Sequence, residues 1–193
     1  VNCPFGAIID KSQIFQTITA IKSGIPVYAA VAPAIAGQFG KATSGQLRSA
    51  MKAVGFADVM EVAIGADLCT IAEAKDFMEE VPAKQPFMAT SCCPAWSVMA
   101  KTEFPEFKDC ISMALTPMVL TARRLKKEHP ECRIVFVGPC AAKKLEAIRE
   151  TIRSDVDFVL TFEELMGMFE AKGIDFASIP ESEGLNEGTG AGR

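Results

Sequence analysis

The sequence has 193 residues, enough for one large domain or two small ones, and 49% of them are hydrophobic. With 8% aromatic residues and a mean hydropathy of +0.21, the composition excludes a disordered or fibrous chain. A net charge of −4 offers no basic surface for nucleic acid or an anionic membrane. No apolar run approaches the roughly 18 to 20 residues that cross a bilayer. We therefore expect a globular protein that binds neither nucleic acid nor membranes.

Helix-like repeats and short apolar segments alternate along the chain. The first predicted helix has Ile14, Ile18 and Ile21 on one face and is closed by Gly24 with Pro26. Further helices are predicted over residues 45–54, 68–80, 94–103, 117–130, 142–153 and from 162 onward. The apolar segments between them predict buried strands at residues 27–32, 59–64, 87–90, 133–137 and 158–160. Strands separated by helices of this length predict right-handed crossovers. The expected fold is α/β, with a mostly parallel sheet flanked by helices on both faces.

The seven cysteines are the unusual feature of the composition. A disulfide framework would favour an even number and a secretion signal, and residues 1–4 carry no such signal. We therefore expect reduced thiols in the cytoplasm, some of them metal ligands. Because the sequence starts without Met and ends in a glycine-rich run at 187–193, we expect a piece of a longer polypeptide.

Two cysteine motifs each follow a predicted strand and open a predicted helix. They are TSCCPAW at residues 90–96 and GPCAAKK at residues 138–144. Ligand sites in parallel sheets gather at the carboxyl ends of strands, and a helix N-terminus stabilises a thiolate. Adjacent side chains diverge, so one of Cys92 and Cys93 can bind metal while the other points elsewhere. On spacing alone, both could equally be small buried hydrophobes.

The two motifs, their order and separation, and the stretch GADL at 65–68 resemble the FeFe hydrogenases. The resemblance covers the chain from Cys3 to the end, and Gly138, where many members have Met, is similar to the branch called group B. It implies that residues 11–193 are the first of two α/β lobes of the catalytic domain. Residues 1–10 would be the remnant of an upstream ferredoxin-like cluster segment. The family's third motif would lie beyond residue 193, so we expect this part alone to be inactive.

The resemblance implies an H-cluster, a 4Fe–4S cubane joined to a diiron subcluster, which reversibly reduces protons to H2. Cys93 and Cys140 correspond to two of the four cubane ligands. Cys92 corresponds to the cysteine that passes protons to and from the cluster. Lys143 resembles the lysine that donates a hydrogen bond to an iron-bound cyanide. The backbone wall around the diiron unit corresponds to Ala32 and Pro33.

A proton relay to solvent is also implied by the resemblance, through Glu73, Ser112 and Asp76. Glu73 and Asp76 lie three residues apart and share one helix face. Asp76 replaces a more usual Glu, so a water would bridge the shorter side chain. Without the resemblance, the two carboxylates would read as a solvated helix face and Ser112 as a turn residue.

The expected partners are the rest of the same polypeptide, a ferredoxin as electron carrier, and H2 with protons. Three alternatives remain open. A sensory hydrogenase would share every motif, whereas hydrogenase-like iron–sulfur assembly factors characteristically lack the cysteine at position 92. A plain thiol-redox protein would favour a C-x-x-C spacing, which Cys92 and Cys93 do not have.

The remaining residues of interest have no motif around them. Cys3 resembles the last cysteine of a ferredoxin-type cluster motif, with its partners outside the sequence. Structural or surface thiols are expected at Cys69, Cys110 and Cys132. Lys144 is expected to be an exposed helix lysine.

Overall fold

The core of the protein is a sheet of four parallel strands in the order β2–β1–β3–β4. The computed structural model describes residue 4, residues 10–185 and residue 188. Its strands are β1 (Val27–Val31), β2 (Asp58–Glu61), β3 (Arg133–Gly138) and β4 (Phe158–Thr161). The two central strands are buried over almost their whole length, as the apolar segments predict.

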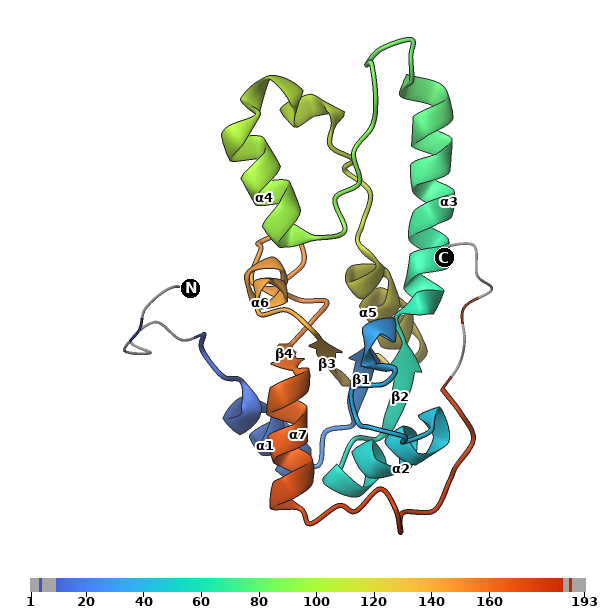
Figure 1. Cartoon of the computed structure of the whole chain (residues 1–193), viewed down its shortest axis with the longest axis vertical. Helices are drawn as coiled ribbons and strands as arrows, with labels where there is room; N and C mark the ends of the chain where they lie inside the picture. The colour runs from blue at the N-terminus through green and yellow to red at the C-terminus, as the bar shows by residue number, and fades with distance from the viewer. Residues whose placement is uncertain (1–3, 5–9, 186–187, 189–193) are drawn as a thin grey trace.

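Helices cover both faces of this sheet, which confirms the predicted α/β fold (Figure 1). Helix α5 packs on β1 and β3, while α2 and α7 contact each other on the opposite face. The helices are α1 (Ile14–Lys22), η1 (Pro33–Ile35), α2 (Ser44–Val54), α3 (Ala63–Glu80), α4 (Pro94–Glu103), η2 (Pro105–Cys110), α5 (Pro117–Glu128), α6 (Ala142–Ala147) and α7 (Phe162–Ala171).

Helix α3 and the pair α4 and η2 project beyond the carboxyl edge of the sheet (Figure 1). The base of α3 lies against α5 because residue 65 is glycine. A Cβ atom there would lie 2.3 Å from the Pro117 carbonyl oxygen and 2.3 Å from the Thr121 hydroxyl oxygen. The glycine therefore permits α3 and α5 to cross closely.

The structure differs from the predicted elements in three places. The stretch 87–90 is no strand of the sheet, because its only described pairing is an isolated bridge from Ala89 to Ile111. The predicted strand 59–64 ends at Glu61, and α3 begins at Ala63 instead of 68. Apolar residues at the base of α3 continue the pattern of the strand, so periodicity alone cannot separate them.

The third difference concerns α6, which ends at Ala147 although a helix was predicted over residues 142–153. The chain continues in turns, in which the backbone N–H groups of Ile152 and Arg153 both bond to the Arg149 carbonyl. Ile152 is buried from this turn and not from a helix face. The helical spacing of apolar residues therefore predicted the wrong C-terminal end for this helix.

Candidate active site

Both cysteine motifs lie at the carboxyl edge of the sheet, where each enters a helix. Cys93 is the N-cap of α4, and its Sγ accepts a hydrogen bond from the Trp96 N–H at 3.5 Å. The Sγ of Cys140 accepts one from the Ala142 N–H at 3.4 Å, just after β3. Cys92, Cys93 and Cys140 are all exposed. The thiolate is the form of cysteine that binds metal.

Lys143 connects the two motif loops. Its Nζ donates a hydrogen bond to the Cys92 carbonyl oxygen at 2.8 Å and another to Glu146 Oε2 at 2.6 Å. Its side chain is only 14% exposed. The lysine of the second motif therefore holds the backbone of the first motif in place.

Glu146 is the buried partner of that lysine, and its side chain is 1% exposed. The Thr116 hydroxyl donates to Glu146 Oε1, so both carboxylate oxygens have partners. A carboxylate removed from water needs such pairing. The sequence analysis missed Glu146, although its position three residues after Lys143 places it on the same face of α6.

Lys144 is not the exposed helix lysine that was expected. Its side chain is 12% exposed and donates to Glu164 Oε1 at 2.9 Å and also to the Asp10 carboxylate. Burial alone would lower the pKa of Lys144, but the hydrogen bonds to these two carboxylates outweigh it and raise the pKa. The expectation failed because α7 and the segment before α1 converge on this helix face, which no local pattern indicates.

Gly138 ends β3 beside the aromatic ring of Phe136. A Cβ atom at position 138 would lie 2.4 Å from Phe136 Cε1, and Phe136 is itself buried. Lys143 Nζ lies 6.0 Å from the centre of the same ring. The ring therefore occupies the space that a side chain at position 138 would take.

We expect Gly138→Met to lower the free energy of unfolding by about 1–3 kcal/mol, the usual cost of overpacking. In the double variant Gly138→Met with Phe136→Leu, the smaller side chain makes room, and part of that loss should be recovered. Urea unfolding of the two single variants and the double variant checks this. Strictly additive losses would show that the two positions do not compete for space.

The candidate relay residues lie on separate elements. Glu73 on α3 has one carboxylate oxygen that is buried and has no hydrogen-bond partner in the described part of the chain. Asp76 is exposed on the same helix, and Ser112 is buried next to the loop that precedes Cys92, with its N–H donating to the Ala89 carbonyl. Among the described side chains no hydrogen bond joins Glu73, Ser112 and Asp76. A continuous relay needs water between them.

Cys69 lies near Glu73 and Cys92, although the sequence indicated only a structural or surface thiol. Cys69 is buried on α3. Cys110 and Cys132 are also buried, in other parts of the chain. Burial, followed by the charges of Glu73 and Cys92, raises the pKa of the Cys69 thiol to about 11. Glu73, Cys92 and Cys69 therefore lie close together. The charge of Lys143 also reaches this thiol and lowers its pKa, against the larger effects that raise it.

The raised pKa predicts selective labelling of the thiols. At pH 8 to 9, iodoacetamide should modify the exposed Cys92, Cys93 and Cys140 and leave Cys69 as an unreactive thiol. Peptide mass spectrometry after timed quenching measures each rate. In urea all four should react at similar rates, which serves as the control. Fast labelling of Cys69 in the folded chain would contradict the described burial.

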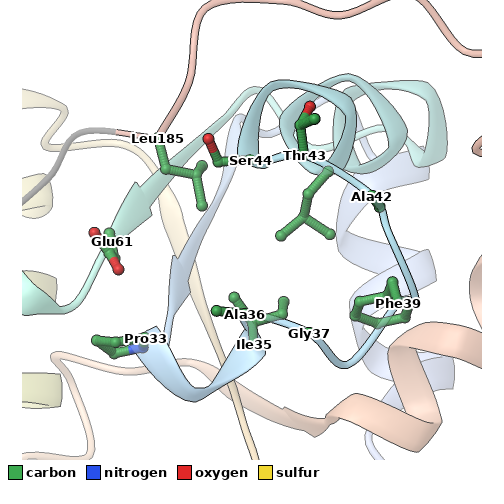
Figure 2. A pocket seen from close by; sticks show the side chains of 11 residues that line it. Pro33, Ile35, Ala36, Gly37, Phe39, Ala42, Thr43, Ser44, Glu61 and Leu185 are labelled. Carbon is green, nitrogen blue, oxygen red and sulfur yellow. The ribbon is translucent and has the colours of Figure 1, made fainter.

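Ala32 and Pro33 follow β1 at the same edge of the sheet. Ala32 is buried, and Pro33 is exposed at the wall of a cavity of about 460 Å³. Figure 2 shows the cavity between η1 and the start of α2, with Phe39 and Leu185 on its sides. None of the described cysteines lines this cavity. This cavity is therefore not a common centre for the described cysteines.

Large apolar side chains are exposed on the elements that project beyond the sheet. They include Leu68, Ile71, Phe77, Met78, Trp96, Val98, Met99, Phe104 and Phe107. Such exposure is characteristic of surfaces that another protein segment covers. In the part of the chain that the structure describes, no three His, Cys, Asp or Glu side chains are placed to hold a metal ion. The position of Cys3 lies outside the described residues.

Comparisons with known proteins identify relatives. The model for the C-terminal domain of the iron-only hydrogenase large subunit matches residues 25–193. Iron hydrogenase 1 of Clostridium pasteurianum is 29% identical over 98% of this chain and 37% of its own length. The periplasmic Fe hydrogenase large subunit of Nitratidesulfovibrio vulgaris is 31% identical over 75% of this chain and 38% of its own. The chain thus spans well under half the length of these relatives.

Two further matches widen the comparison. A solved FeFe hydrogenase, described for oxygen inactivation through its two-iron subcluster, has a TM-score of 0.79 at 26% identity, covering 93% of this chain and 53% of that one. A cytosolic Fe–S cluster assembly factor of Kluyveromyces lactis is 33% identical over 52% of this chain and 21% of its own length. Within the described residues, no helix has the length and apolar character needed to cross a membrane.

Proposed function

Because the chain belongs to the iron-only hydrogenase large-subunit family, we propose that it forms part of a hydrogenase that interconverts protons and H2. The observation that carries this proposal is the link between the two cysteine loops. Lys143 holds the Cys92 carbonyl from the loop that contains Cys140, so both motifs are directed to the same edge of the sheet. Two cysteine loops held together by a side-chain hydrogen bond suit a shared cluster better than two unrelated structural thiols.

The donor set fits part of an H-cluster. Cys93 and Cys140 are exposed thiols with backbone N–H groups directed at sulfur, and cysteine thiolates are the ligands that hold 4Fe–4S clusters. We propose that they bind the 4Fe–4S cubane, with the remaining ligands supplied by other parts of a longer polypeptide. When bound, the cluster with its diiron subcluster supplies the electron transfer and the iron chemistry.

The other site residues would transfer protons or hold a ligand of the cluster in position. Cys92, exposed beside Cys93, takes up and releases protons at its Sγ. Glu73, whose buried oxygen lacks a described partner, is placed to accept a hydrogen bond from a water on the outward path, and Ser112 and Asp76 continue that path. Lys143 would donate to an anionic ligand of the cluster.

The proposal makes the buried Ala32 and its neighbour Pro33 part of the wall beside the diiron unit. The apolar surface of α3 and α4 would be covered by a second lobe of the same domain, with residues 11–193 as the first lobe. We also propose a ferredoxin as electron carrier and a cytoplasmic location. The location rests on the odd number of thiols, and cell fractionation tests it.

The test uses the natural polypeptide that contains this sequence, purified without oxygen and matured with its cluster. We expect H2 evolution with a reduced electron donor, together with iron and acid-labile sulfide. Cys93→Ser and Cys140→Ser should each lose iron as well as activity. Bound iron without any H2 evolution or uptake would overturn the proposed activity.

An iron–sulfur assembly factor is the second candidate function, favoured by the similarity to the Kluyveromyces lactis protein. Such a protein would bind cluster iron through Cys93 and Cys140 without turning over H2. The same preparation distinguishes the two functions, because transfer of iron and sulfide to an apo-ferredoxin in the absence of H2 turnover would favour assembly. A sensory hydrogenase would share the same motifs and differ in its attached signalling domains.

A further inference from the structure

An apolar groove of about 540 Å³ runs between α1 and α7, next to the end of α2. Helices α1 and α7, which form its walls, lie in the lower part of Figure 1, and none of the described cysteines lines it. Its lining residues are Ile14, Ile18, Ile21, Lys22, Val54, Gly167, Met168, Ala171 and Lys172. The function proposed above uses none of them.

The shape of the groove suits a helix. Ile14, Ile18 and Ile21 recur at helical spacing and form one wall along α1. On α7, Gly167 and Ala171 lie one turn apart, and a Cβ atom at position 167 would meet nothing within 4 Å. A glycine inside an exposed helix destabilises that helix relative to alanine. Here it leaves the wall of the groove low enough for another backbone to approach closely.

The positive charge of the groove lining favours a partner with acidic side chains. Its only charged lining residues are Lys22 and Lys172, and no acidic side chain lines it. Both lysines are exposed, and neither forms an ion pair with any residue that the structure describes. The chain as a whole carries a net charge of −4, whereas the lining of this groove is positively charged. Complementary charge at such a rim selects partners and speeds their association.

We propose that this groove binds an amphipathic helix of a partner protein that carries Asp or Glu at one end of its apolar face. The apolar side chains of the partner would pack on the α1 isoleucines and Met168, and its carboxylates would face Lys22 and Lys172. Helix-in-groove recognition uses this combination of apolar anchors and flanking charge. The proposal is independent of H2 chemistry.

The test uses two synthetic helical peptides with the same apolar face, one with Glu and one with Lys at the flanking positions. Fluorescence anisotropy measures their binding to the full chain. We expect the Glu peptide to bind at least tenfold more tightly than the Lys peptide. The double variant Lys22→Glu with Lys172→Glu should reverse that preference, whereas Lys41→Glu, at an exposed site outside the groove, should not change it.

A second variant tests whether binding depends on the shape of the groove as well as on its charge. Gly167→Leu fills the groove while favouring helix, so a tenfold weaker affinity for the Glu peptide could not be caused by unfolding. Equal binding of both peptides, or binding unaffected by Gly167→Leu, would overturn the proposal. Binding of anionic phosphatidylglycerol vesicles in place of the Glu peptide, lost in the lysine double variant, would show that the groove takes lipid and would also overturn it.

Discussion

Replacing Glu146 by alanine is expected to lower the free energy of unfolding by about 3 kcal/mol or more, the usual cost of breaking a buried ion pair. Glu146 is 1% exposed and is the only described carboxylate bonded to Lys143. Its removal leaves the ammonium group with the Cys92 carbonyl alone and leaves the Thr116 hydroxyl without its acceptor. Most of the loss therefore comes from desolvated groups left without partners.

Urea unfolding followed by circular dichroism measures this effect. Glu150→Ala is the matched control, because Glu150 is exposed three residues after α6 and has no described ion pair. We expect that control to change stability by less than about 0.5 kcal/mol. In a Glu146→Ala background, Lys143→Met should cost less than it does in the original chain. Equal effects of Glu146→Ala and Glu150→Ala would show that the buried pair does not form.

Cys92→Ala is expected to reduce H2 turnover by the natural polypeptide by about 10²-fold to 10⁴-fold, the range for removal of a positioned acid or base. The iron and acid-labile sulfide contents should stay unchanged, because Cys93 and Cys140 are the proposed ligands. Cys92 Sγ is exposed, so its replacement leaves the core intact. The combination of lost turnover and retained cluster would identify a proton-transferring group.

Ser91→Ala controls for damage to the loop, since it changes the preceding side chain without removing the thiol. We expect it to retain most of the activity. Cys92→Ser supplies the matched comparison, because a hydroxyl is a much weaker acid than a thiol and should not restore turnover. If Cys92→Ala loses iron in proportion to activity, Cys92 is a ligand, and the division of roles between Cys92 and Cys93 is wrong.

The sheet and most helices could be predicted from the sequence because their patterns are local. Thr161 and Glu164 form the expected capping box at the start of α7. Gly55 ends α2 with a φ of 124°, which favours glycine. The stretch 87–90 failed because a strand needs a neighbouring strand. The only pairing of this short apolar run among the described residues is the bridge to Ile111.

The site was predicted only where one motif carried the information. Cys140 lies between β3 and α6, as its motif predicts, whereas Cys93 begins α4 as predicted but follows a segment that is no strand of the sheet. The partners of Lys143 and Lys144 do not follow from the motifs, since the Cys92 carbonyl and Asp10 come from distant parts of the chain. Such pairings depend on how α4, α6 and α7 pack, and this is a property of the tertiary fold.

The bond between Lys143 and the Cys92 carbonyl closes a loop of 51 residues. Closing a loop of this length restricts the chain at an entropic cost that grows slowly with length. In this protein the packing that buries Glu146 offsets this entropic cost during folding. A cluster arriving at the cysteines would meet loops that already share a fixed orientation, so its affinity would not be reduced by the work of ordering them.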